Sequence, residues 1–164
     1  MSSSLAESMI NAASLEIAGK KEEALAELCQ ARDAGHHSPK LYGAIGHLQF
    51  ELRSFEAAAQ SYEEALRMDP DDSTAHYDRA VCLEKLRAWE DAAAGFQRAI
   101  ELDSRRASAH LGLGIAQLHL GRPREALSCF EKCLERQPFR EAALRGQAVA
   151  LHLLERYGEA SESY

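Results

Sequence analysis

Cysteine and histidine are the residue types in this sequence that can bind a metal ion. Cys129 and Cys133 are four residues apart, which places both sulfurs on one face of a helix. Cys133, however, occupies a position that is alanine in the equivalent stretches of the chain, which favours a small buried side chain. The pair His36 and His37 lies in a segment typical of a solvent-exposed loop. We therefore predict no metal site and no cofactor.

Catalytic side chains are present, but not in catalytic combinations. The sequence contains no C-x-x-C pair, no H-E-x-x-H motif and no glycine-rich phosphate loop. Asp71, Asp72 and Ser73 precede an expected helix, where short polar side chains cap free backbone N–H groups. The remaining serines fall in the N-terminal tail or on expected helix surfaces. We predict no catalytic residue and a protein that is not an enzyme.

The elements that carry these side chains are predicted to be helices. The chain has 164 residues, of which 46% are hydrophobic and 27% charged, which suits a folded domain with its own core. Alanine and leucine supply 50 residues, whereas valine, isoleucine and threonine supply only 8. Because β-branched residues are the ones that favour strands, the fold class is predicted to be all-α.

Charge and apolar patterning indicate a cytoplasmic protein. No apolar run approaches the roughly 20 residues needed to cross a bilayer, and the first residues lack a basic segment followed by an apolar core. Four cysteines without framework-like spacing suit a reducing compartment. A formal net charge of −7 disfavours nucleic acid as a partner. We expect cytoplasmic localisation, with neither membrane nor nucleic acid as a partner.

An internal repeat of 34 residues organises the chain. After a tail of residues 1–4, the units are 5–38, 39–72, 73–106 and 107–140, followed by a truncated unit at 141–164. Position 20 of the unit is small and position 24 is large in every copy. The small residues are Ala24, Ala58, Ala92, Ala126 and Ala160, and the large ones are Leu28, Tyr62, Phe96, Phe130 and Tyr164.

Each unit is predicted to form two helices of about 14 residues joined by a tight turn. Gly19 and Gly121 occupy this turn, where a left-handed residue can end the first helix, while Arg53, Arg87 and Glu155 stand there in the other copies. One such hairpin cannot bury its apolar face alone, so neighbouring hairpins must stack. All four prolines fall at expected helix boundaries: Pro39, Pro70, Pro123 and Pro138.

These units resemble tetratricopeptide repeats, whose outline is an aromatic at position 4, Leu-Gly at 7 and 8, Tyr at 11, Ala at 20, Phe at 24 and Pro at 32. The resemblance covers nearly the whole chain and implies a right-handed superhelical solenoid of stacked antiparallel helix hairpins. Departures include Arg79 at position 7 and His76 and His110 at position 4. The second unit matches through Tyr42, Ile45, Gly46, Ala58, Tyr62, Ala65 and Pro70, and the fourth through Leu113, Gly114, Ala126, Phe130 and Pro138.

The two end units differ from the rest. The first has polar residues at usually apolar positions, such as Asn11 and Arg32, and is predicted to cap a single domain spanning residues 5–164. The fifth stops at Tyr164, inside its expected second helix, so we expect the natural chain to continue.

In the family, positions 2, 5, 6, 9, 12 and 13 of the first helices line a concave groove. Here positions 5 and 9 form a largely apolar stripe, which is explained either by partial burial between adjacent helices or by a groove that binds a peptide or helix of a partner protein. On the second interpretation, the groove residues are Met9, Ala44, His47, Tyr77, Asp78, Val81, Lys85, Leu111, Ile115, Arg145 and Val149.

Two recognition devices known in the family are missing. Some members grip a chaperone's C-terminal carboxylate with Lys, Asn and Arg, but the matching positions here are Met9, Ala13, Ala44, Thr74 and Asp78. The asparagine ladder of the O-linked N-acetylglucosamine transferase arm is also absent, because position 6 is Ile10, Ala44, Asp78, Gly112 and Gly146.

The net charge is concentrated in the first two units. They carry −3 and −4, whereas the third, fourth and fifth carry 0, +2 and −2. This distribution is consistent with a basic partner segment over the first two units, or with a role in solubility alone.

The sequence supports three hypotheses about function. The first is a non-catalytic protein-interaction scaffold that binds a partner peptide or helix in the groove. The second is a substrate-recruiting or regulatory arm of a longer enzyme. The third is a self-assembling scaffold, because a truncated last unit exposes Leu144, Ala148 and Leu151 to a second copy.

Overall fold

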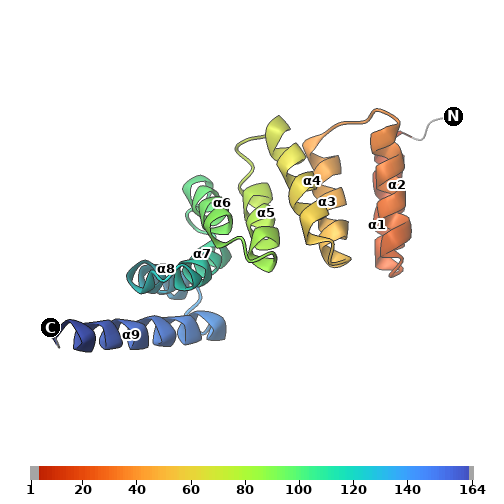
Figure 1. The fold of residues 1–164 in the computed structure, drawn as a ribbon. Coiled ribbons are helices and arrows are strands. Elements are labelled where there is room, and N and C mark those ends of the chain that lie inside the picture. The colour runs from red at the N-terminus through yellow and green to blue at the C-terminus, as the bar shows by residue number, and fades with distance from the viewer. Residues whose placement is uncertain (1–3, 163–164) are drawn as a thin grey trace. The chain divides into compact units, whose positions relative to one another are not determined.

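The computed structural model describes residues 4–162, and within that range it contains nine α-helices and no strand (Figure 1). The all-α prediction is confirmed. No helix in the described range is long and apolar enough to cross a membrane. The helices are α1 (Leu5–Ile17), α2 (Lys21–Asp33), α3 (Pro39–Glu51), α4 (Phe55–Met68), α5 (Ser73–Lys85), α6 (Trp89–Leu102), α7 (Ala107–His119), α8 (Pro123–Arg136) and α9 (Glu141–Glu162).

The chain forms two compact units, which we call the first unit (residues 1–82) and the second unit (residues 83–164). In the first unit α1 packs against α2, α2 against α3, and α3 against α4. In the second unit α6 packs against α7, α7 against α8, and α8 against α9. Figure 1 shows consecutive helices within each unit running antiparallel as hairpins. The prediction of one domain over residues 5–164 stays a prediction.

Short polar side chains cap the starts of α1, α3 and α5. Ser4 and Glu7 form a reciprocal capping box at α1, with N···O distances of 2.9 and 3.3 Å. The Ser38 hydroxyl accepts a hydrogen bond from a backbone N–H in the first turn of α3. Asp72 Oδ1 accepts the Thr74 backbone N–H at 2.8 Å, so the capping role predicted before this helix is confirmed for Asp72. The first helices of the repeats begin 34 residues apart.

In the turn inside each complete repeat, one residue adopts the left-handed backbone conformation, whether or not that residue is glycine. Gly19 and Gly121 have φ of 76° and 69°, and Arg53 and Arg87 adopt 62° and 60°. The N–H of the next residue donates to a carbonyl five residues earlier, at 2.8 or 2.9 Å in all four turns. This hydrogen bond and the packing of the hairpin offset the cost of about 1–2 kcal/mol that a non-glycine residue carries in this conformation.

The expected turn of the fifth repeat is not formed. Glu155 lies inside α9, which runs without interruption from Glu141 to Glu162. The prediction of a second helix in the fifth repeat is therefore wrong. Glu155 keeps a helical backbone and so avoids the cost of about 1–2 kcal/mol that a non-glycine residue carries in the left-handed conformation. The side chains at positions 157–162, and Tyr164 entirely, lie outside the described residues.

Alanine and glycine allow the core aromatics to approach closely. The alanines at position 20 of the four complete repeats are fully buried, as predicted. In the second unit, a Cβ at Gly112 would lie 2.5 Å from Phe96 Cζ, and one at Gly146 would lie 2.4 Å from Phe130 Cζ. The second unit therefore requires glycine at these positions, because the rings occupy the space of a side chain.

Candidate functional site

Three cavities of the first unit meet at His47. The Met9 cavity, of about 190 Å³, lies between α1 and α3, and the Phe50 and Gly43 cavities, of about 240 and 250 Å³, lie between α3 and α5. Each contains His47 in its lining. We call the three together the His47 groove.

The Phe50 cavity combines aromatic and acidic side chains. Phe50 packs edge-on against Phe55, with ring centroids 5.3 Å apart, so its ring is held by its neighbour. Tyr62 is buried, and burial followed by the charge of Asp78 raises the pKa of its phenol. The residues that line this cavity are His47, Phe50, Glu51, Tyr62, Tyr77, Asp78 and Val81.

The Gly43 cavity owes its width to a missing side chain. Gly43 lies in the interior of α3, where a Cβ would meet no atom within 4 Å. The residues that line this cavity are Pro39, Gly43, His47, Tyr62, Ala65, Asp72, Thr74, Ala75 and Asp78. The Met9 cavity continues the groove toward α1 and is lined by Met9, Ala12, Ala13, Glu16, Leu28, Ala44, His47 and Leu48.

The His47 groove is acidic. Four carboxylates line it, those of Glu16, Glu51, Asp72 and Asp78, and no lysine or arginine is among the described lining residues. His47 Nε2 donates to Glu16 Oε1 at 3.1 Å. The groove therefore presents negative charge beside apolar surface.

One lysine from outside the lining reaches a groove carboxylate. Lys21 Nζ lies 2.7 Å from Glu51 Oε2. The hydrogen bond from Lys21, with its charge, holds the pKa of Glu51 below the usual value, and the same contact raises the pKa of Lys21. Glu51 is therefore held in its ionised form.

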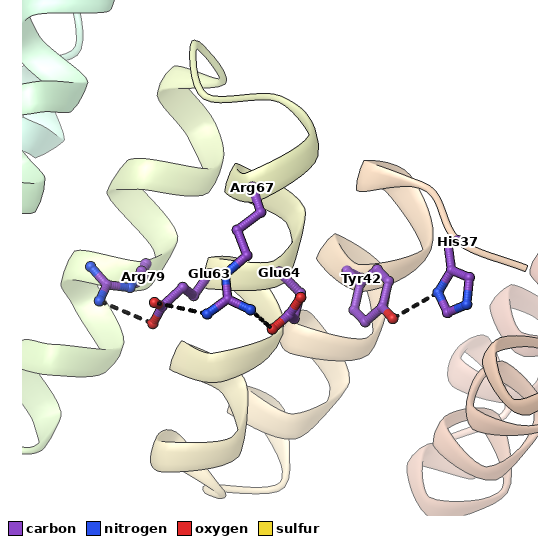
Figure 2. Close-up of polar contacts among 6 residues, drawn as sticks. All are labelled: His37, Tyr42, Glu63, Glu64, Arg67 and Arg79. Atoms are coloured by element: carbon purple, nitrogen blue, oxygen red, sulfur yellow. Dashed lines mark hydrogen bonds and ion pairs between the residues drawn. The ribbon is translucent and has the colours of Figure 1, made fainter.

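Two arginines close to the groove are engaged with other glutamates. Figure 2 shows Arg79 of α5, whose Nη2 lies 3.4 Å from Glu63 Oε2, and Arg67 of α4, which pairs with Glu63 and Glu64. The figure also shows Tyr42 with its hydroxyl 2.9 Å from His37 Nδ1. None of the side chains in this view lines the three cavities. Arg67 and Arg79 are therefore paired with carboxylates of α4.

The predicted groove residues of the first unit lie together. Met9 and Ala44 line the Met9 cavity, Tyr77 and Val81 line the Phe50 cavity, and Asp78 lines both cavities next to α5. His47 lines all three. Every residue that the sequence assigned to this part of the groove thus borders the same hollow surface.

The predicted residues of the second unit are placed differently. Leu111 is 7% exposed and belongs to the core cluster around Phe130, and Ile115 packs against the same cluster. Lys85 and Arg145 are exposed, and Arg145 pairs with a glutamate one turn earlier at 3.2 Å. Val149 is about half exposed. Their assignment to a groove stays a prediction.

Sequence reasoning missed Glu16, Phe50, Glu51 and Tyr62 as groove residues. The first three stand at positions 12 and 13 of their repeats, which are groove positions in the family, so the signal was present in the spacing. Tyr62 was assigned to the core, where it is indeed buried, yet it also forms the wall of two cavities.

A second polar cluster lies in the second unit. Trp89 stacks on His119 with ring centroids 3.8 Å apart and planes 7° apart. Burial raises the pKa of the Glu84 carboxyl, opposed by the nearby charges of Lys85 and His119. A separate cavity of about 300 Å³ in this unit is lined by α6, α7 and the turn after α7, and contains none of the predicted site residues.

The cysteines and acids of the described residues do not assemble a metal site. No group of three or more His, Cys, Asp or Glu is arranged there to hold an ion. Burial raises the pKa of Cys82 to about 12 and of Cys129 to about 11, so both thiols are protonated near neutral pH.

Comparison with known proteins agrees with the geometry. Tetratricopeptide repeat profiles match residues 44–107 and 107–139, which together make up more than half of the chain. Comparison with curated protein sequences finds no match.

Several solved structures share the fold. A structure of the MamA protein matches with a TM-score of 0.81 and 18% identity, over 94% of this chain and 85% of that one. YrrB, described as a TPR protein with an unusual peptide-binding site, matches with a TM-score of 0.78 and 20% identity, over 84% and 71%. The first TPR of Spaghetti (RPAP3), bound to the HSP90 peptide SRMEEVD, matches with a TM-score of 0.69 and 20% identity, over 71% and 93%. Repeat period, helix boundaries and matching profiles agree, and the chain belongs to the tetratricopeptide repeat family.

Proposed function

We propose that this chain is a non-catalytic, cytoplasmic protein-interaction scaffold that binds a segment of a partner protein in the His47 groove. The observation that carries the proposal is the convergence of six predicted groove residues on three adjoining cavities of the first unit. YrrB and the Spaghetti repeat domain, which share the fold, are described with a peptide-binding site and a bound peptide.

The size of the cavities supports a polypeptide ligand. Each measures about 190–250 Å³, below the roughly 300–1,000 Å³ typical of pockets for drug-sized molecules. A row of three small hollows fits successive side chains of one chain better than a single compact molecule. The groove would therefore derive its affinity from several side-chain contacts along a segment.

The proposal is tested by placing an uncharged polar side chain in the apolar lining of the Phe50 cavity. A peptide is first selected with the full chain from a displayed random library, and its affinity is then measured by fluorescence polarisation. Val81→Asn replaces an apolar side chain of the lining by a polar one and is expected to weaken binding at least about tenfold, the equivalent of about 1.4 kcal/mol. Circular dichroism verifies that the variant keeps its helicity.

Gln60→Asn is the matched control, because it introduces the same side chain at an exposed position of α4 that lines none of the cavities. Its affinity is expected to equal that of the unaltered chain. Equal binding by Val81→Asn and Gln60→Asn would overturn the proposal.

Self-association is a second candidate, which the exposed apolar face of α9 favours. Leu144 and Leu151 are each 44% exposed, and Ala148 on the same face of the helix is exposed as well. Such a row can pack against the same row of another copy. Sedimentation equilibrium should then give a mass that rises with concentration, and Leu151→Glu should return it to that of one chain. A mass independent of concentration would contradict this candidate.

A further inference from the structure

We infer that the segment accepted by the His47 groove is basic, with lysine or arginine side chains next to an aliphatic or aromatic one. This inference rests on the proposed function and specifies the chemistry of the partner. It follows from the charges that line the groove, the helix ends that meet there and the apolar wall between them.

Charge complementarity is the first argument. Carboxylates enter the groove from three helices and one loop: Glu16 from α1, Glu51 from α3, Asp78 from α5 and Asp72 from the loop before α5. No arginine or lysine is among the described residues of the lining. The repeats that form the groove also carry the −3 and −4 of formal charge noted above. A cationic segment would be attracted and an anionic one repelled.

At the Met9 and Phe50 cavities, the C-terminal helix ends add to the same negative potential. Glu16 and Glu51 stand in the last turns of α1 and α3, and neither of those turns contains a basic residue. The C-terminal end of a helix carries a partial negative charge because its last carbonyls lack intrahelical partners. Lys21 offsets part of the charge of Glu51, but it approaches from α2 and does not line the cavities.

The apolar surface between the carboxylates indicates the second feature of the ligand, an aliphatic or aromatic residue next to the basic one. Phe50 from α3 and Tyr77 and Val81 from α5 give the Phe50 cavity its apolar lining, and Glu51 and Asp78 line the same cavity. The aliphatic stem of a lysine or arginine can cover these side chains while its charged end reaches a carboxylate. A neighbouring aliphatic or aromatic residue of the ligand would fill the cavity itself.

An acidic ligand is expected to be rejected. The HSP90 peptide SRMEEVD, bound by the Spaghetti repeat domain, carries three acidic side chains within its last four residues. In this chain Asp78, at position 6 of the third repeat, lines two of the cavities, so such a peptide would bring like charges together. SRMEEVD is therefore a suitable negative probe.

The test uses the full chain and a random nine-residue peptide library. Selected sequences are expected to be enriched in Lys and Arg, with an aliphatic or aromatic neighbour, and depleted in Asp and Glu. For the strongest selected peptide, Asp78→Asn and Glu16→Gln should each weaken binding about two- to fivefold, the range of exposed charge pairs. Raising the ionic strength from about 0.05 to 0.5 M should weaken it further, because exposed charges are screened. SRMEEVD should not bind.

The control is Glu64→Gln, which removes a carboxylate that pairs with Arg67 outside the groove. Its effect on affinity should be negligible. Selection of neutral or acidic peptides that still lose affinity in Val81→Asn would overturn the inference and leave the proposed function standing. Basic peptides that bind Val81→Asn as well as the unaltered chain would overturn both. A selection that enriches no sequence would also count against both.

Discussion

The two units differ in the space between position 24 of one repeat and position 6 of the next. In the first unit this space forms part of a cavity, and in the second unit an aromatic ring fills it. Position 24 of one repeat faces position 6 of the next. In the second unit these pairs are Phe96 with Gly112 and Phe130 with Gly146, and the rings lie where a Cβ would be. In the first unit the corresponding pairs are Leu28 with Ala44 and Tyr62 with Asp78, and all four side chains line cavities.

The difference shows how one scaffold produces two kinds of surface. A glycine lets the aromatic ring of the preceding repeat close the contact, so the second unit is tightly packed there. An aspartate keeps the space open and introduces a charge. The choice of residue at position 6 therefore decides whether the first-helix face contributes to packing or is available to a ligand.

The largest expected effect comes from transferring the aspartate to the closed unit. Gly112→Asp would place its Cβ about 2.5 Å from the Phe96 ring and a carboxylate in buried surroundings. Overpacking and an unpaired buried charge should together cost about 4 kcal/mol or more. Trp89 is the chain's only tryptophan and lies in the second unit, so its fluorescence during urea unfolding measures the loss.

The reverse change, Asp78→Gly, is expected to cost less than Gly112→Asp, because it creates neither a steric clash nor a buried charge. Similar losses in Gly112→Asp and Asp78→Gly would remove the distinction between the closed and open units.

A smaller effect on stability is expected from substitutions that add a single methyl group. Gly112→Ala should destabilise the second unit by about 1–3 kcal/mol, because the buried Phe96 ring must shift. Gly43→Ala in the first unit meets no atom within 4 Å and should stabilise its helix by about 1 kcal/mol. Urea midpoints followed by circular dichroism give both values. A stabilising Gly112→Ala would show that the contact with Phe96 is not tight.

Two glutamates should change the stability of the protein with pH in opposite directions: Glu84 in the second unit and Glu51 in the first unit. Burial raises the folded-state pKa of Glu84, so its ionised form opposes folding above its unfolded pKa near 4.5. Glu84→Gln should therefore raise the melting temperature at neutral pH, and this gain should disappear as the pH falls below 4.5. Thermal unfolding between pH 4 and 7 provides the measurement, and a gain independent of pH would refute this assignment.

The smallest effect is expected at Glu51 in the first unit. Its pKa is lowered by the hydrogen bond from Lys21, so its ionised form favours folding. Glu51→Gln should slightly lower the melting temperature at neutral pH, and the difference should vanish as the pH falls below its folded-state pKa. Removing Lys21 as well should produce no additional loss, since the two side chains act as a pair.

Most of the fold could be predicted because the repeat is regular. The five first helices begin 34 residues apart, and the prolines, position-20 alanines and left-handed turns of the four complete repeats lie where the period places them. The prediction failed at Glu155, which stays helical, whereas Arg53 and Arg87 adopt the left-handed conformation. Local spacing does not distinguish these three residues, because all of them occupy the same position of the repeat.

The site could be predicted only in part. Spacing placed Tyr77, Asp78 and Val81 on one face, and the structure shows that they border cavities. Spacing alone did not reveal that Leu111, at the same position as Tyr77, is buried by the second unit's core. The difference arises from neighbouring helices, whose approach depends on Gly112 and Gly146.

The central claim is that the open first unit binds a basic segment. It is tested most directly by nuclear magnetic resonance titration of the labelled full chain with the strongest peptide from the random-library selection. We predict that the amide signals around His47, in α1, α3 and the first half of α5, shift on binding, while the indole N–H signal of Trp89 does not. Shifts centred on α6, α7 and Trp89, with the His47 region unchanged, would contradict the claim.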